Sequence, residues 1–313
     1  MAVGRVYRFY VRSILSDGYM WFWAVAFMAF WLFMGAYVYG AGTTIEEFSK
    51  QFPEGTPGTI INEAWSKFTL HYTAGWYGSI ALFSMSSVTI GLVYYIFYST
   101  IPIRYLTKYS KATTAKFYTG FTLAAITGVV VCTIVLLVTT ILLYSYRFYG
   151  AELKDYHGLP VPVFKNLVLP ENPVGVLATT IAGGVLMYFI GATVALLVIV
   201  LKKPRALGLA SFLPHILSFG LGMAGLIATG GKVHFSPYNT ILLLNYHYYA
   251  NATLVLDEPV TMMWRSGLEG AGQVLEPSTL WLALLGWILL FAAASVVLFK
   301  KQRGVNVEQI LSL

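Results

Sequence analysis

The chain has 313 residues and a formal net charge of +7, and 58% of its residues are hydrophobic while only 11% are charged. Soluble domains have about a quarter of their residues charged, so this composition excludes an ordinary soluble protein and predicts an integral membrane protein. The basic excess does not indicate nucleic-acid binding, because the basic residues are sorted among particular loops, as membrane topology requires.

Six apolar stretches are each long enough to cross a bilayer as a helix, which takes about 20 residues. In chain order the predicted spans are 20–40, 72–98, 117–146, 174–201, 206–229 and 280–299. Asn172 and Pro173 precede the fourth span as a favourable cap and first turn. We therefore expect an all-α polytopic fold of six transmembrane helices in a single domain over residues 1–313. An even number of spans places both termini on the same side.

The basic residues give the orientation of these spans. Thirteen of the 20 Lys and Arg residues lie before the first span, between spans two and three, between spans four and five, and after the sixth. Those segments contain only two acids, Asp17 and Glu308, whereas the other set of loops holds seven bases and the remaining acids. Because basic loops stay inside, both termini are predicted to be cytoplasmic in a multi-pass protein of the cell membrane.

Residues 1–19 are predicted to form an interfacial helix. Arg5, Arg8 and Arg12 are spaced by three and four among apolar residues, which is typical of an amphipathic helix lying on the inner membrane surface in contact with lipid. A frayed basic leader is the alternative. The stretch is not typical of a cleavable signal, because the apolar run that follows is too long and aromatic.

The connector between spans two and three, residues 99–116, is short and basic. Arg104, Lys108 and Lys111 would share one face of a helix, with Tyr105 and Tyr109 alongside. Ser99, Thr100 and Pro102 form a pattern at which helices begin. The alternative is an ordinary inside loop that only obeys the positive-inside rule.

Three segments are predicted on the outer side. Residues 41–71 are expected to include a short amphipathic helix around Trp65, and 147–172 an extended path stiffened by prolines. In the longest segment, 230–277, the apolar run 240–256 is interrupted by Asn245, His247 and Asn251, which favours a structure packed on the bundle rather than a seventh span. Asn251 also begins an N-glycosylation sequon.

No catalytic, cofactor or metal site is predicted. The single cysteine, Cys132, lies within a span, and the five histidines do not form a ligand set; His215 is interpreted as a packed polar group. The chain has no phosphate-binding G-x-x-x-x-G-K-[ST] loop and no Asp, Glu, Lys or Arg at a span centre. A secondary carrier is disfavoured, because ion-coupled carriers usually need such a residue.

This arrangement resembles the permease subunits of type-2 ATP-binding cassette (ABC) exporters over essentially the whole chain. The resemblance rests on the basic N-terminal helix, six spans with both ends inside, the connector IRYLTKYSKATTAKFYTG, the long outer segment before the last span and the final LFKKQRG. The connection from 147 to 172 is longer than the family pattern.

The resemblance implies a transport subunit that is not itself an enzyme. Residues 101–110 would be the coupling helix that fits a cytoplasmic ABC ATPase subunit, with contacts from Arg104, Tyr105, Lys108, Tyr109 and Lys111. ATP would be bound by that partner. A second permease copy or a paralogue would complete the translocation path, formed chiefly by spans two and five. The alternative function is a non-transporting membrane scaffold or anchor subunit of a larger complex.

Overall fold

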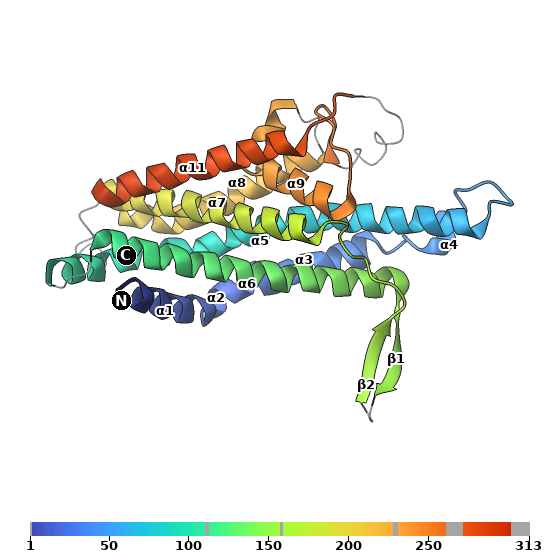
Figure 1. Ribbon diagram of the computed structural model, residues 1–313, viewed down its shortest axis with the longest axis horizontal. Coiled ribbons are helices and arrows are strands. Elements are labelled where there is room, and N and C mark those ends of the chain that lie inside the picture. The colour runs from blue at the N-terminus through green and yellow to red at the C-terminus, as the bar shows by residue number, and fades with distance from the viewer. Residues whose placement is uncertain (1, 110–112, 157–158, 228–230, 261–271, 302–313) are drawn as a thin grey trace.

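The protein is an elongated bundle of helices that run along one axis, with a β-hairpin projecting from its side (Figure 1). The computed structural model describes residues 2–109, 113–156, 159–227, 231–260 and 272–301. The long helices are α5 (Gly58–Tyr109), α6 (Thr114–Tyr149), α7 (Pro173–Val200), α8 (Leu207–Ile227) and α11 (Pro277–Lys301). The first span, Gly18–Tyr39, joins α2 (Gly18–Trp21), α3 (Phe27–Phe33) and the π-helical turns η1 (Phe22–Ala26) and η2 (Met34–Tyr39).

Five of these segments are long and apolar enough to cross a membrane within the described parts of the chain: the first span, α5, α6, α7 and α11. They coincide with five of the six predicted spans, which is typical of a membrane-embedded helical protein. The predicted fifth span is helical as α8, but it is not among the five. Six spans with both termini inside therefore stay a prediction.

Helix α5 differs most from its predicted boundaries of 72–98. It has 52 residues, so it is about 78 Å long and exceeds a bilayer at both ends. The expected helix start at Pro102 is wrong, because α5 continues through it to Tyr109. The two supposed capping hydroxyls are engaged elsewhere: Thr100 Oγ1 donates to the Phe97 carbonyl at 2.7 Å, and Ser99 Oγ lies 2.7 Å from Tyr10 Oη.

The first span owes its shape to a four-residue repeat of buried side chains: Met20, Ala24, Met28, Leu32 and Ala36, each at most 2% exposed. In an α-helix of 3.6 residues per turn, a spacing of four drifts by about 40° per step. The wider i→i+5 turns of η1 and η2 offset that drift and keep the stripe facing α5 and α6. Gly35 in η2 admits the Trp76 ring of α5, which a Cβ at this position would overlap.

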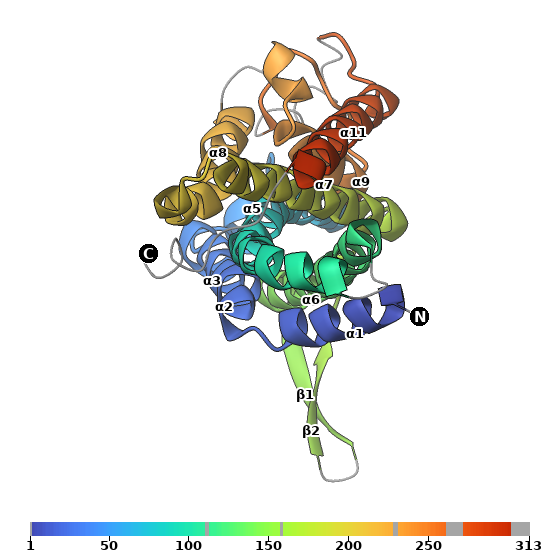
Figure 2. The ribbon, with the colours of Figure 1, turned by 90° about the vertical axis from the view of Figure 1, so that its left-hand side faces the viewer.

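The predicted interfacial helix is present as α1 (Ala2–Leu15) and crosses one end of the bundle obliquely (Figure 2). Tyr10 packs on the rings of Phe117 and Phe121 in α6. Arg5, Arg8 and Arg12 are all exposed on this helix, and its place on the inner membrane surface stays a prediction.

The basic segments gather at one end of the bundle. Helices α5, α7 and α11 end, and α6 begins, at the end that carries α1, and the last turns of α5 extend farthest (Figure 1). By chain position this end includes Lys116, the pair Lys202 and Lys203, and the pair Lys300 and Lys301. We call it the basic end and the other the outer end.

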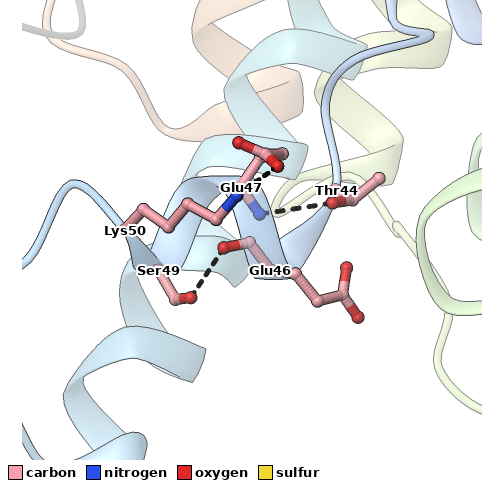
Figure 3. A network of polar contacts seen from close by, with 5 residues as sticks. All are labelled: Thr44, Glu46, Glu47, Ser49 and Lys50. Carbon is pink, nitrogen blue, oxygen red and sulfur yellow. Dashed lines mark hydrogen bonds and ion pairs between the residues drawn. The ribbon is translucent and has the colours of Figure 1, made fainter.

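Helix α4 (Ile45–Ser49) lies at the outer end and is fixed by local contacts (Figure 3). Thr44 Oγ1 caps it by accepting from the Glu47 N–H at 3.3 Å, and Lys50 Nζ donates to Glu47 Oε1 at 2.5 Å. Phe48 packs on Trp65, which lies in the first turns of α5. The amphipathic helix expected around Trp65 is therefore part of α5 rather than a separate element.

The extended path predicted after Arg147 is an antiparallel hairpin of β1 (Ala151–Tyr156) and β2 (Leu159–Phe164), so the fold is not wholly α-helical. Pro160 and Pro162 pair with Asp155 and Leu153. A two-stranded hairpin tolerates prolines because both of its strands are edge strands. It projects away from the bundle in both views (Figures 1 and 2).

The apolar run 240–256 forms α9 (Asn239–Ala250), which packs against α5, α7 and α11 and is almost wholly buried. At 12 residues it is about 18 Å long, too short to span, as the sequence predicted. Thr180 Oγ1 of α7 donates to Asn245 Oδ1 at 2.9 Å and lies 3.0 Å from Tyr77 Oη of α5. This chain of hydroxyl and amide groups joins three helices inside the apolar core. The short turns η3 (Pro204–Ala206) and η4 (Gly231–Phe235) precede α8 and α9.

Candidate functional site

A cavity of about 880 Å³ lies between the first span, α5 and α8. Half of its lining residues are Phe, Tyr or Trp. We call it the aromatic cavity, and its walls are Phe27, Met28, Trp31, Tyr39, Phe68, His71, Tyr72, Gly75, Trp76, Ser79, Ile80, Phe83, His215, Ile216, Phe219, Ile227, Tyr246 and Val260.

One face of α5 forms the long wall of this cavity. The eight α5 residues in the lining recur at spacings of three and four from Phe68 to Phe83, which places them on one helical stripe about 22 Å long. Gly75 and Ser79, the two smallest residues on the stripe, leave space between the rings of Tyr72, Trp76 and Phe83. A cavity of these dimensions accommodates an elongated apolar molecule.

The opposite wall is held by contacts between the first span and α5. Tyr39 stacks on Trp76 with ring centroids 5.6 Å apart, and the Tyr72 hydroxyl donates to the Gly35 carbonyl at 2.8 Å. Arg147 of α6 donates to the carbonyls of Ala36 and Gly40 at 3.0 and 2.7 Å. A guanidinium at a helix C-terminus satisfies carbonyls that have no partner within the helix and complements the helix dipole.

Two imidazoles supply polar groups to this largely apolar lining. His71 Nδ1 lies 2.9 Å from Tyr246 Oη, near the outer end of the α5 stripe. His215 Nδ1 lies 3.1 Å from both Ser86 Oγ and Ser87 Oγ, at the other end of the stripe. Because Nδ1 is engaged in each ring, Nε2 is the nitrogen that remains for a ligand, as donor or acceptor according to the tautomer.

The serines around His215 form a local network. Ser86 Oγ also contacts Ser218 Oγ at 2.8 Å, and both Ser86 and Ser87 donate to the Phe83 carbonyl. The interpretation of His215 as a packed, hydrogen-bonded group agrees with this geometry, but the residues next to it do not indicate that its ring also borders a cavity. The stripe from Phe68 to Phe83 was the available signal, since its aromatic residues recur at helical spacing.

The predicted coupling residues do not belong to this cavity. Arg104, Tyr105, Lys108 and Tyr109 lie in the last turns of α5 at the basic end, where the structure describes only the backbone. Lys111 lies outside the described residues. The backbone spacing keeps Arg104 and Lys108 on one face of α5. No group of three or more His, Cys, Asp or Glu side chains suited to a metal ion occurs in the described parts of the chain.

Comparison with known proteins adds no family assignment. The chain matches no protein-family model, and no curated protein is significantly similar to it. The resemblance to type-2 ABC permeases therefore stays a prediction from the sequence.

Proposed function

We propose that this chain is the membrane permease subunit of an ABC exporter in the cell membrane, driven by a separate cytoplasmic ATPase subunit. The observation that carries the proposal is that one helix, α5, both walls the aromatic cavity and ends in the basic turns at Arg104 and Lys108. ATP-driven movement at the basic end would then act on the cavity through a continuous helix. A second copy or a paralogue would complete the path.

The cavity favours a lipid-like or amphipathic cargo. Its lining is aromatic and aliphatic over the length of the stripe, and its polar side chains include His71 and His215 near the two ends. Such a surface binds an apolar body by burial and orients it through a few hydrogen bonds. A hydrated ion would lose its solvation there without compensation.

The coupling role is tested by reversing charge at one end of α5. Arg104→Glu with Lys108→Glu is expected to leave the protein inserted but to abolish stimulation of the co-purified ATPase, because charge-assisted contacts to the partner are reversed. The matched control is Lys50→Glu with Lys67→Glu at the outer end, where both lysines are exposed. Equal ATPase stimulation in the two double variants would refute the coupling role.

The cargo role is tested by filling the cavity. Gly75 lines it, and a Cβ there meets nothing within 4 Å, so Gly75→Leu is expected to fold normally and to reduce cargo movement at least tenfold. Gly286→Leu on α11 is the control, since Gly286 also has open space around it but does not line the cavity. Unchanged transport of a fluorescent lipid by Gly75→Leu would exclude the cavity as the path.

The projecting hairpin β1–β2 favours a second candidate, a scaffold subunit that binds a partner at the outer end. Its side chains Leu153 and Val163 are 74% and 41% exposed. Purification from native membranes in mild detergent, with mass spectrometry of bound chains, separates the two functions. A stoichiometric ATPase supports the permease, and a stable outer partner without any ATPase supports the scaffold.

A further inference from the structure

A second cavity lies at the basic end, in the corner between α1 and the inner half of α5, and encloses about 630 Å³. Its walls include Tyr19, Tyr94, Tyr95 and Tyr98, and we call it the tyrosine groove. Two contacts fix α1 on α5 beside it: Tyr10 Oη to Ser99 Oγ at 2.7 Å, and the Tyr95 hydroxyl donating to the Ser13 carbonyl at 3.2 Å. The groove is therefore a built feature of the junction between the interfacial helix and the bundle.

Asp17 contributes a carboxylate to this groove, at the end of the molecule where the charge is otherwise basic. Its Oδ1 accepts the N–H groups of Tyr19 and Met20 at 2.9 and 3.4 Å, which caps α2. Its Oδ2 faces Gly91 of α5, where an added Cβ would be 3.7 Å away. The Tyr95 hydroxyl lies beside this carboxylate, but its single hydrogen is donated to the Ser13 carbonyl, which leaves Oδ2 as an acceptor for a ligand.

Tyrosine rings and a carboxylate that line one groove suit an organic ammonium group. A cation is attracted to the face of an aromatic ring, and quaternary and primary ammonium groups are bound in this way by aromatic cages. Tyr94 and Tyr98 are stacked with centroids 6.4 Å apart, and Tyr19 and Tyr98 are 46% and 47% exposed, so their rings are accessible. An anion would meet the Asp17 charge instead and be repelled.

The position of the groove indicates where that ammonium comes from. The groove lies where the amphipathic α1 meets the first span, which is the depth of lipid head groups. The exposed Arg5, Arg8 and Arg12 of α1 are suited to lipid phosphate beside it. We propose that the tyrosine groove binds the ammonium head group of a phospholipid, such as ethanolamine or choline, in the inner leaflet. This inference is independent of the proposed transport function.

Native mass spectrometry of the purified full-length protein tests the assignment. The protein is incubated with phosphatidylethanolamine, phosphatidylcholine or phosphatidylglycerol of identical acyl chains, and the retained lipid is counted. We expect at least one of the two ammonium lipids to be retained about tenfold more than the glycerol lipid. Equal retention of all three lipids would overturn the proposal.

Variants show whether the tyrosine groove is responsible for the preference for ammonium lipids. Asp17→Asn keeps an N-cap acceptor and removes only the charge, so it is expected to abolish the preference while α2 remains capped. Tyr98→Leu, at an exposed ring, is expected to weaken the preference severalfold even if Asp17→Asn does not fold. Glu63→Gln and Tyr146→Leu, which are exposed and lie outside the groove, are the matched controls. A preference that survives both groove variants would also overturn the proposal.

Soluble choline and ethanolamine distinguish the two possible sources of an ammonium group. If the lipid is the ligand, millimolar amounts of either amine compete only weakly, because they lack the acyl chains. Asp17-dependent binding of the soluble amine without any lipid preference would contradict the lipid assignment.

Discussion

Helix α11 is more apolar than helix α5, yet it is much less buried. The most apolar stretch of α11 has a mean hydropathy of 2.6 and is 17% buried, whereas that of α5 has 1.8 and is 89% buried. Several large residues of α11, including Leu282 and Leu289, face outward. The buried side chains of α5 include Ser84, Ser86 and Ser87. In a membrane, small and hydroxyl-bearing residues therefore mark the interior, since lipid is as apolar as leucine.

The first span is the exception to this rule. Its mean hydropathy is 1.7, close to that of α5, yet only 28% of it is buried. Part of its surface borders the aromatic cavity, and Phe22, Phe30 and Phe33 are about half exposed. This span is held by its one buried stripe and by particular contacts, such as those of Arg147.

Equivalent glycine substitutions in α5 and α11 give the largest expected contrast. A Cβ on Gly78 would lie 3.0 Å from the Leu242 carbonyl oxygen, whereas one on Gly286 meets nothing within 4 Å. Gly78→Leu is expected to destabilise the protein by about 3 kcal/mol through overpacking, and Gly286→Leu to be neutral or slightly stabilising. Thermal unfolding in detergent measures both. Similar melting temperatures for the two variants would contradict the inferred difference in packing between α5 and α11.

Arg147 tests how the first span is held. Arg147→Met keeps the apolar stem but removes the donors to the Ala36 and Gly40 carbonyls, at a cost of about 2–3 kcal/mol. Lys154→Met in the exposed strand β1 is the control and should change the melting temperature little. A proteolysis assay at the outer end should detect release of the first span. An unchanged digestion pattern would argue that packing alone holds it.

The core network gives a smaller effect. Thr180→Val leaves Tyr77 Oη and Asn245 Oδ1 without their shared partner and should cost about 1–2 kcal/mol. Thr139→Val is the matched control, because the Thr139 hydroxyl donates only to the Val135 carbonyl of its own helix. Equal melting temperatures for Thr180→Val and Thr139→Val would show that the network contributes nothing to the stability of the fold.

The smallest effect is a pH dependence at the outer end, where η4 lies beside α11. Burial lowers the pKa of His234, against a smaller opposing effect of Asp257, so the folded protein favours the neutral ring. The stability from this group is present above the ordinary histidine pKa of about 6.5 and is lost as the pH falls below it. His234→Gln should therefore show a smaller drop in melting temperature between about pH 8 and pH 5. Identical drops in the melting temperatures of the variant and the unaltered protein would show that His234 does not contribute to the pH dependence.

Hydropathy and charge predicted much of this fold, and particular residues explain what they missed. The spans matching the first span, α6, α7 and α11 were found because their apolar runs end close to the helix ends. A helix was expected around Trp65, but its continuity with the second span was missed because the charged residues Glu63 and Lys67 lie outside the apolar run. The helix start predicted at Pro102 was wrong because the Ser99 hydroxyl contacts Tyr10 of α1, which is a tertiary contact, and the Thr100 hydroxyl donates to the Phe97 carbonyl within α5.

The sites were predicted less well than the fold. The α5 wall of the aromatic cavity is readable as a stripe, but its partners, Trp31 and His215, come from helices whose relative placement the sequence does not encode locally. The tyrosine groove likewise depends on how α1 meets α5. Asp17 stood out in the sequence only as an acid in a basic segment.

Because α5 is one unbroken helix, a tilt of this helix would move both of its ends at once. If it tilts by about 5° around its middle, each end of this ~78 Å rod moves by about 3 Å, in opposite directions. A protein bound at the outer end, near Glu63, would then oppose or assist motion at Arg104. By thermodynamic reciprocity, what binds at the basic end must alter affinity at the outer end by the same factor. The outer end of such a protein would report the state of its basic end.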